Sequence, residues 1–542
     1  MWVTTAGGLD WPSTTDTRRQ QESLRGIVRT LQAANINTVF FQVRARGDAY
    51  YASGVEPWAQ NLTGTLGKDP GWDPLAFLLE EAHRSGIEVH AWFNVFKINS
   101  GRLPPRTTPP HPARAFPGWC AEVDGETWLD PGNPAVRSYL IRVAMDLVRR
   151  YDLEGLHLDF IRYPGRTFPD GESFARHGRG RSRDEWRRSN IDRFVADLYD
   201  SATTVRPRLK VGSAPVGLYE NDPASRAEGA PVTVYQNALA WLRAGKQDYL
   251  VPQVYWDTGA SRGDPDFSSV VRGWAAASGT RHIYAGVGAY KPEILSELPR
   301  QIDIARGAGA RGAAFFRYEF IRSPGVYGGR YTARALVPPM PWKDATPPLA
   351  PWDLTAAETA PDVFRLDWNP PRPATDGETA RRYAVYRSAG GRVDAADPRN
   401  LVAVLPGDAA WFIDTVRTPS GVSYTYAVTA LDRLWNESAA TAVAHAKVHR
   451  AVALGGFETP GLGMAVAEGE DETTLVGYRL PAEGRVLLEI EPAGGQPVRL
   501  VDTTQAAGMY VVGLAGGRFP PGDYNITLTA EGRRVVKAVP MR

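Results

Sequence analysis

The sequence predicts an α/β protein in which a (β/α)8 TIM barrel is followed by two all-β sandwich domains. Over about the first 335 residues, eight short β-branched or aromatic runs alternate with amphipathic helical stretches, the pattern of βα units around a parallel sheet. Six prolines then fall within the sixteen residues 336–351, a composition typical of a stiff linker. From about residue 346 the apolar pattern changes to period two with frequent turns, which indicates antiparallel β domains.

The number of predicted parallel strands is the main evidence for a barrel. The strands are Trp2–Thr5, Thr38–Arg44, Glu88–Asn94, Gly155–Asp159, Lys210–Ala214, Tyr249–Trp256, His282–Gly288 and Gly312–Phe316. Eight βα units in this length match a TIM barrel with loop insertions. The alternative is an open doubly wound sheet. No glycine-rich phosphate-binding motif follows any of these strands, which disfavours the nucleotide-binding versions of that fold.

Helices are expected between the strands, and several carry recognisable end signals. They include Arg18–Ala34, Pro74–Ser85, Pro134–Tyr151, Ser182–Val205 and Pro292–Gly307. Asp73 and Asn133 each precede a proline, so each pair combines an N-cap with proline at the first helical position. The predicted barrel domain is 1–340.

Alternating apolar residues predict strands in the rest of the chain. Segment 346–447 resembles a fibronectin type III domain, with Trp368 in the position of the core tryptophan and Tyr424 in that of the corner tyrosine. Segment 450–542 is also composed of short alternating strands. It resembles the small sandwiches of the sorting or hook-capping type that end many exported bacterial proteins.

Composition limits the classes of partner. The 542 residues are 43% hydrophobic and 23% charged, as in a globular protein, and the formal net charge is only +2. Such a balance provides no field for concentrating phosphates, so we expect no nucleic-acid partner. No apolar run approaches the roughly 20 residues of a membrane-spanning helix. The single cysteine, Cys120, rules out an internal disulfide.

Polar and aromatic residues gather where the predicted strands end, which is where a barrel builds its active site. The candidates are Arg44 and Asp48 after the second strand, Trp92 and Asn94 on the third, Asp159 and Arg162 at the fourth, and Gln253, Tyr255, Trp256 and Asp257 at the sixth. Sugar rings stack on aromatic faces, while amides, carboxylates and arginines hydrogen-bond hydroxyl groups. This mixture indicates a polysaccharide substrate.

Asp159 is the first candidate for a catalytic carboxylate. Glycoside cleavage needs one protonated carboxyl group to assist the leaving oxygen and one ionised group to attack or to activate water. Asp159 ends an apolar strand beneath the rim, where desolvation and the neighbouring Arg162 would push its pKa in opposite directions.

Several ordered motifs resemble the family-10-like glycosyl hydrolases of bacterial lipoproteins. The motifs are Trp2-Val-Thr-Thr with Leu9-Asp-Trp-Pro, Phe41-Gln-Val-Arg with Gly47-Asp-Ala-Tyr, Glu56-Pro-Trp with Leu62-Thr-Gly, Ala91-Trp-Phe-Asn, Asp130-Pro-Gly-Asn-Pro, Gly155-Leu-His-Leu-Asp and Pro252-Gln-Val-Tyr-Trp. The resemblance covers about residues 2–320. It implies a barrel hydrolase acting outside the cytoplasm on the glycan strand of peptidoglycan.

The second carboxylate is less evident. The fourth strand is similar to the chitinase signature, but Ile161 stands where that signature has its glutamic acid. The general acid must therefore come from another strand, and we assign it to Asp257, with Glu319 after the eighth strand as the alternative.

Several candidates also have an interpretation in which the residue has only a structural role. Successive strand residues face opposite sides, so only about half of the aromatic residues at the strand ends can face the cleft. Arg44 could instead form a structural ion pair with Asp48 or Asp159. His90 and His157 are expected to be core histidines, and no metal-ligand spacing is found, so we expect neither metal nor cofactor.

Two other functions stay open from the sequence. A non-catalytic polysaccharide-binding barrel would explain the lack of a clear second carboxylate. An α-glucan hydrolase would need a fifth-strand glutamate, and that strand ends in Ser213-Ala-Pro-Val-Gly. We expect an extracellular or cell-envelope protein, held there through its C-terminal domains. The chain opens directly on its first predicted strand, so we expect the signal peptide to be encoded upstream.

Overall fold

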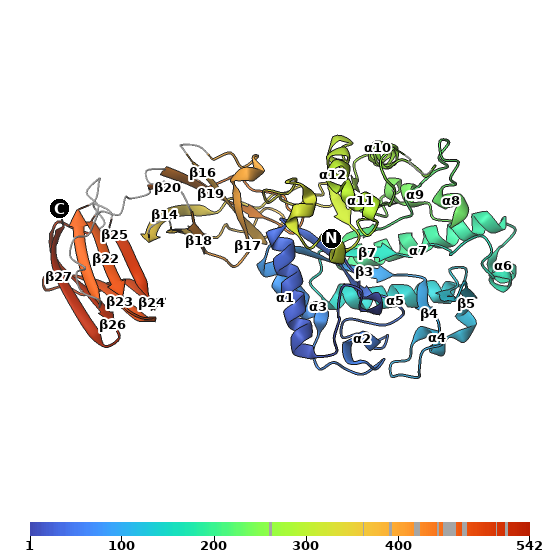
Figure 1. The fold of residues 1–542 in the computed structure, drawn as a ribbon, viewed down its shortest axis with the longest axis horizontal. Coiled ribbons are helices and arrows are strands. Elements are labelled where there is room, and N and C mark those ends of the chain that lie inside the picture. The colour runs from blue at the N-terminus through green and yellow to red at the C-terminus, as the bar shows by residue number, and fades with distance from the viewer. Residues whose placement is uncertain are drawn as a thin grey trace. The chain divides into compact units, whose positions relative to one another are not determined.

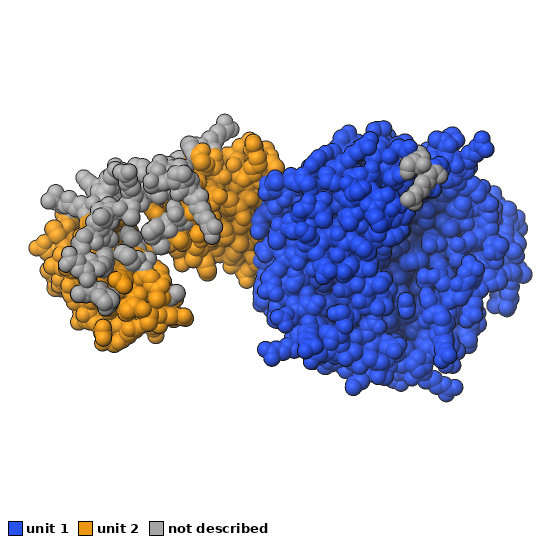
Figure 2. Space-filling model, viewed as in Figure 1, with its two compact units in different colours: residues 1–345, 433–436 blue, residues 346–432, 437–542 orange. Residues whose placement is uncertain are grey.

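The protein forms two compact units in a computed structural model (Figure 2). The first unit is residues 1–345 with 433–436, and the second is 346–432 with 437–542. The structure describes residues 1–259, 263–360, 363–389, 393–416, 423–441, 444–447, 462–468, 474–505, 507–514 and 519–541. The predicted boundary between the two sandwiches, at 447–450, lies mostly outside these residues.

Parallel strands in chain order form the centre of the first unit (Figure 1). They are β1 (Trp2–Val3), β2 (Thr38–Arg44), β3 (Glu88–Asn94), β7 (Gly155–Asp159), β8 (Lys210–Ser213), β9 (Tyr249–Leu250), β10 (Gln253–Val254), β11 (His282–Ile283), β12 (Ala285–Val287) and β13 (Ala313–Phe315). One sheet has the order β1-β2-β3-β7-β8-β9-β11, and the second has the order β10-β12-β13. In the chain, β10 and β12 of the second sheet directly follow β9 and β11 of the first. The unit is therefore TIM-barrel-like.

The first and last of these strands approach each other through side chains. The rings of Trp2 and Phe316 lie 6.1 Å apart, and Arg317 pairs with Asp10 at 2.5 Å. Neither of the two parallel sheets described pairs the backbone of β1 with that of β13.

Helices connect the strands as the sequence predicts. They are α1 (Thr17–Ala33), α2 (Gln60–Thr63), α3 (Pro74–Arg84), α4 (Pro112–Ala115), α5 (Pro134–Arg150), α6 (Gly171–His177), α7 (Arg183–Val205), α8 (Ala230–Thr233), α9 (Ala238–Arg243), α10 (Phe267–Ala277), α11 (Pro292–Ser296) and α12 (Leu298–Gly307). Asp73 and Asn133 accept hydrogen bonds from Ala76 N and Ala135 N, which confirms both predicted N-caps.

Three predicted elements are interrupted. The seventh strand divides at Tyr284 into β11 and β12, and the other two breaks lie at or near a proline. The sixth strand pauses at Pro252, which cannot donate a ladder hydrogen bond, and so divides into β9 and β10. The last predicted helix divides at Glu297, because Pro299 lies in the first turn of α12 and cannot continue the preceding helix.

Strand residues alternate between two apolar layers. Phe40 and Trp92 belong to a cluster inside the sheet with Trp2 and Tyr249, whereas Phe41 and Phe93 belong to the core beneath the helices. Inside, the ring of His157 stacks on Phe40 at 4.0 Å, and Trp2 Nε1 donates to His157 Nε2 at 3.0 Å. His90 Nδ1 lies 2.7 Å from the hydroxyl of Tyr249. Both histidines are core residues, as predicted.

A small antiparallel sheet follows β3 in the chain. It has the order β4-β6-β5, with β4 (Lys97–Ser100), β5 (Cys120–Val123) and β6 (Glu126–Leu129). Asp124 and Gly125 join β5 to β6 with φ of 51° and 75°, as a tight hairpin turn requires.

The second unit consists of antiparallel sheets. The pair at 346–447 has the orders β14-β15-β18 and β17-β16-β19-β20, with β14 (Trp352–Ala360), β15 (Val363–Asn369), β16 (Arg382–Ala389), β17 (Leu401–Pro406), β18 (Trp411–Thr415), β19 (Ser423–Leu431) and β20 (Ala444–Lys447). Trp368 and Tyr424 are buried in the core of these sheets. Four residues of this stretch, 433–436, belong instead to the first unit, where Trp435 Nε1 donates to Glu88 Oε1 at 2.6 Å.

The last stretch of the second unit contains a similar pair of sheets. Their orders are β21-β22-β25 and β24-β23-β26-β27, with β21 (Gly463–Glu468), β22 (Thr474–Leu480), β23 (Gly484–Pro492), β24 (Val498–Gln505), β25 (Gly508–Leu514), β26 (Gly522–Ala530) and β27 (Arg533–Met541). Among the described residues, no helix combines the length and apolar character needed to cross a membrane.

Gly155 provides a test of the packing inside the parallel strands. A Cβ at this position would lie 2.3 Å from the ring of His90, so Gly155→Ala should destabilise the protein by about 1–3 kcal/mol. Gly26 of α1 meets nothing within 4 Å, so Gly26→Ala should stabilise by about 0.5–1 kcal/mol. Thermal denaturation of both variants checks this pair, and equal melting temperatures would contradict the packing described.

Candidate active site

Asp159 lies at the carboxyl end of β7, pointing into the interior of the parallel strands. Its side chain is buried, with the residue 8% exposed, and Oδ1 accepts from Phe160 N at 2.7 Å and Gln253 Nε2 at 3.4 Å. Burial raises the pKa of this carboxyl to about 6, although the Phe160 N–H, Arg162, Trp92 and Lys97 oppose the shift. A carboxyl group with this pKa exchanges protons near neutral pH, as acid–base catalysis requires.

Aromatic side chains surround Asp159. Trp92 is buried in the interior cluster, and its indole N–H makes no hydrogen bond of normal geometry within the described residues. Tyr255 stacks on Phe316 with ring centroids 5.8 Å apart. Burial raises the pKa of the Tyr255 phenol, and the charge of Asp159 raises it further. The structure therefore brings Trp92, Gln253 and Tyr255 together with Asp159, as the sequence predicts.

Trp256, two residues beyond the end of β10, lies on the opposite side of the chain from Tyr255. It packs against the core beneath the helices, and its carbonyl accepts from Gln301 Nε2 at 3.0 Å. Of the two adjacent aromatic residues, Tyr255 thus faces Asp159 and Trp256 faces the helices, as the alternation along a strand requires.

Arg44 is enclosed in the protein rather than presented to a ligand. Its Nε and Nη2 donate to the two carboxylate oxygens of Glu56, each at 2.7 Å, and both side chains are fully buried. Nη1 donates to the carbonyls of Asn94 and Val95. Burial is the largest influence on the pKa of Arg44 and lowers it, but the charge and hydrogen bonds of Glu56, together with Tyr139 and Tyr51, raise the pKa above its ordinary value.

A β-bulge explains this position of Arg44. In the pairing of β2 with β3, Gln42 lies opposite Trp92 and Arg44 lies opposite Phe93, so the register shifts between these two positions. Such an irregularity re-aims the side chains beyond it. The guanidinium consequently lies 4.8 Å from the ring centroid of Phe93, beneath the helices. This geometry does not favour the predicted sugar contact, and the ion pair is made with Glu56 instead of Asp48 or Asp159.

Asn94 and Asp48 have their polar atoms occupied within the protein. Asn94 Nδ2 donates to Ala45 O at 2.9 Å, and its Oδ1 accepts from Gln42 Nε2 at 3.4 Å. Asp48 is buried and accepts from Arg46 N at 2.8 Å. Both residues shape the loop after β2.

The two candidates for the general acid differ in their surroundings. Asp257 is half-buried just beyond β10, and its carbonyl accepts from Phe267 N at the start of α10. Glu319 has a side chain that is 42% exposed, and it accepts from Arg322 Nη2 at 2.9 Å.

A charged cluster lies beside Asp159, which we call the Arg162 cluster: Lys97, Glu126, Trp128, Phe160 and Arg162. Sequence analysis named Arg162 as a candidate but missed the other four residues. Glu126 pairs with Lys97 and accepts from Trp128 Nε1 at 3.2 Å. Lys97 and Arg162 lie over the ring of Phe160, at 5.0 and 5.3 Å from its centroid. Three members come from the sheet inserted after β3, and the Asp124-Gly125 turn signal could have revealed its hairpin.

Phe160 adopts a strained backbone conformation directly after Asp159. Its φ is 53°, in the left-handed region that large side chains rarely occupy. This turn allows Phe160 N to donate to Asp159 Oδ1 and places the aromatic ring between two cations. Strain of this kind is concentrated at functional sites.

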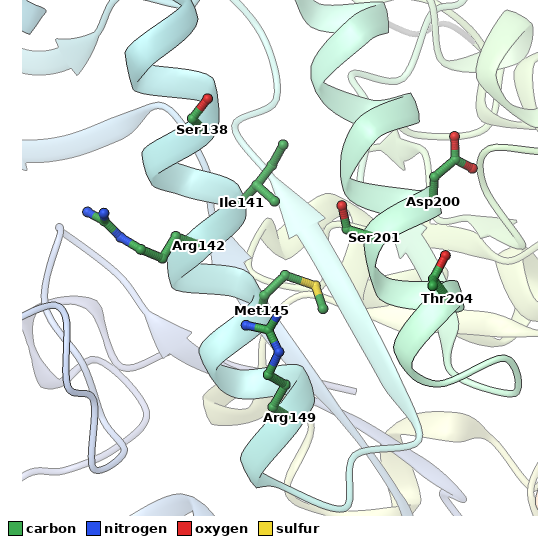
Figure 3. A pocket seen from close by; sticks show the side chains of 8 residues that line it. All are labelled: Ser138, Ile141, Arg142, Met145, Arg149, Asp200, Ser201 and Thr204. Carbon is green, nitrogen blue, oxygen red and sulfur yellow. The ribbon is translucent and has the colours of Figure 1, made fainter.

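A surface groove lies elsewhere, between α5 and α7. Figure 3 shows its lining, with side chains from one helix facing those of the other. The groove measures about 610 Å³ and is lined by Ser138, Ile141, Arg142, Met145, Arg149, Asp200, Ser201 and Thr204. None of the predicted site residues lines it.

Comparisons with known proteins agree with the resemblance in the sequence motifs. The model of the glycosyl hydrolase-like 10 family matches residues 1–299. Glycosyl hydrolase YngK of Bacillus subtilis is 31% identical over 481 residues, which cover 81% of this chain and 92% of that protein. Glycosyl hydrolase DigH of Escherichia coli K12 is 30% identical over 368 residues, covering 60% and 83%.

Comparison with solved structures found a glycoside hydrolase domain. The PgaB (BpsB) glycoside hydrolase domain of Bordetella bronchiseptica has a TM-score of 0.44 and 16% identity, covering 59% of this chain and 94% of that one.

The raised pKa of Asp159 predicts a pH-dependent stability. The folded-state pKa of about 6 exceeds 3.8, the ordinary value of an aspartate in the unfolded chain, so the stabilising contribution of protonated Asp159 is complete below about pH 4 and is lost as pH rises through 6. The free energy of unfolding of the wild type, relative to Asp159→Asn, should fall by about 3 kcal/mol between pH 4 and 7.5. Urea denaturation of both proteins at the two pH values measures this difference, and a pH-independent difference would contradict it.

The buried Arg44–Glu56 pair predicts a large loss of stability when one partner is removed. Arg44→Met leaves the Glu56 charge buried without its ion-pair partner, and should cost about 3–5 kcal/mol. Arg330 pairs with Asp303 at a more exposed position, so Arg330→Gln should cost far less stability than Arg44→Met. Chemical denaturation compares the two, and equal losses would contradict the structural role of Arg44.

Proposed function

Because this chain belongs to the glycosyl hydrolase-like 10 family and is a glycoside hydrolase, we propose that it cleaves the amino-sugar strand of bacterial peptidoglycan. The observation that carries the proposal is the buried carboxylate of Asp159, whose pKa burial raises to about 6, among Trp92, Tyr255 and Gln253. Aromatic faces with amide and carboxylate groups are suited to pyranose rings and their hydroxyl and N-acetyl groups.

In the proposed mechanism, ionised Asp159 acts as nucleophile or base. It attacks the anomeric carbon, or it removes a proton from the water that does so, while a second carboxyl group protonates the departing glycosidic oxygen. We assign this second role to Asp257, which is half-buried beyond β10. Glu319 is the weaker candidate because its carboxylate is exposed and held by Arg322.

The ligand contacts are assigned to residues near Asp159. Trp92 and Tyr255 would stack on sugar rings, and Gln253 and Arg162 would bind polar groups of the chain. Arg44, Asp48 and Asn94 are assigned to positioning, since the protein already uses their polar groups.

The remaining parts of the proposal concern architecture and location. We assign the parallel strands to a closed (β/α)8 barrel, 346–447 to a fibronectin type III-like sandwich, and 450–542 to a small C-terminal sandwich. Peptidoglycan lies outside the cytoplasm, so we propose that the protein acts in the cell envelope or outside the cell, where the sandwiches hold it near its substrate.

The experiment that tests the proposal is product analysis on purified peptidoglycan strands freed of their peptides. The wild type should release reducing ends, and Asp159→Asn should lower the rate by at least about 100-fold, the effect of losing a proton-transferring group. Asp257→Asn and Glu319→Gln, compared under the same conditions, identify the acid.

Three results would overturn this proposal. Near-normal activity of Asp159→Asn would remove Asp159 from the chemistry. Binding of strands by the wild type without any release of reducing ends would instead support a glycan-binding barrel, and cleavage of α-glucans alone would show the wrong substrate class.

A further inference from the structure

Arg162 is a cation beside Asp159 whose charge the protein leaves largely unmatched. Its guanidinium lies 5.4 Å from the ring centroid of Trp128 and 5.3 Å from that of Phe160. Among the described residues, its side chain donates one hydrogen bond, a long contact from Nη1 to Tyr163 O at 3.4 Å. Within the part of the chain that the structure describes, Arg162 forms no ion pair.

The carboxylates nearest to Arg162 are occupied by other donors. Glu126 is bound by Lys97 and Trp128, and Asp159 accepts from Phe160 N and Gln253 Nε2. Both still attract Arg162 electrostatically, but desolvation is the larger influence and lowers the pKa of the guanidinium. Removing an arginine from water without a paired carboxylate is unfavourable, and an anionic ligand would relieve that cost.

We propose that Arg162 binds a carboxylate carried by the sugar next to the scissile bond, so that the site selects an acidic amino-sugar strand. This inference rests on the proposed function and names the chemical group that the site recognises. The planar guanidinium matches a carboxylate with two parallel N–H···O bonds. The rings of Trp128 and Phe160 restrict the position of the guanidinium through cation–π contacts.

The charge balance of the Arg162 cluster supports an anion. Lys97 and Glu126 cancel each other as an ion pair, so Arg162 leaves the cluster with a net charge of +1. A carboxylate bound to Arg162 would restore the neutrality of the cluster.

Peptidoglycan strands freed of peptide carry the required group. Every second sugar has a lactyl ether that ends in a free carboxylate, whereas a neutral chitin strand has none. The same strands can be converted by carbodiimide activation and borohydride reduction, which turn each carboxylate into an alcohol and leave the sugar backbone intact.

The test compares these two strands as substrates and as ligands. The wild type should have a kcat/KM about 10- to 100-fold higher for the carboxylate strand than for the reduced strand, the range expected for a charge-assisted hydrogen bond. Arg162→Gln should lose that factor on the carboxylate strand and little on the reduced strand, so that the preference disappears. Arg149→Gln, an exposed arginine on α5, is the matched control and should keep the full preference.

Binding separates this inference from the proposed function. Calorimetry in the Asp159→Asn background, with and without Arg162→Gln, measures the affinity for both strands without hydrolysis. An affinity preference that disappears with Arg162→Gln supports the inference even if the wild type cleaves neither strand. Two results overturn the inference, whether or not the strands are cleaved. One is an affinity preference for the carboxylate strand that survives Arg162→Gln, and the other is equal affinity of the protein with Arg162 for the two strands.

Discussion

The buried ion pair between Arg44 and Glu56 determines how the end of β3 lies against its neighbours. The guanidinium of Arg44 donates hydrogen bonds to both carboxylate oxygens of Glu56 and to the carbonyls of Asn94 and Val95. Val95 N in turn donates to the carbonyl of Asp159 at 2.8 Å. The loop after β2, the end of β3 and the end of β7 are therefore linked through one charged group. Tyr139 of α5 completes the arrangement by donating to Glu56 at 2.9 Å.

The same region creates the low-dielectric surroundings of Asp159. Trp92 and Tyr255 exclude water, and few groups donate directly to the carboxylate, so desolvation outweighs the nearby cations. Asp10, in the loop after β1, shows the contrast. Burial raises its pKa as well, but three donors, Thr4 N, Arg317 and Glu319 N, occupy its oxygens. Asp10 is thus a connector between strands, whereas Asp159 retains the capacity to react.

Much of the fold could be predicted from the sequence because local signals were strong. The bounds of β2, β3 and β7 match the predicted runs, each a continuous apolar stretch that ends in a charged or amide residue. The caps at Asp73 and Asn133 follow from side-chain chemistry at a single position. The position of Asp159 and its association with Gln253 follow from the rule that parallel strands end at one edge.

Other features depend on tertiary geometry that no local pattern encodes. The bulge after Gln42 turns the side chain of Arg44 toward the core beneath the helices. Strict alternation along β2 would place that side chain in the interior of the parallel strands instead. The Arg162 cluster depends on a hairpin inserted after β3, whose Glu126 lies far in sequence from Asp159 and Arg162. The strained φ of Phe160 is likewise a consequence of the surroundings of the strand end rather than of its own residue type.

The pH dependence of kcat/KM on peptide-free peptidoglycan strands tests the central claim most directly, because it reports the ionisation of the essential carboxylate in the free enzyme. If burial tunes Asp159 as described, activity should rise with pH along a limb whose apparent pKa is about 6. A limb near pH 4, the ordinary range of an exposed aspartate, would contradict the account.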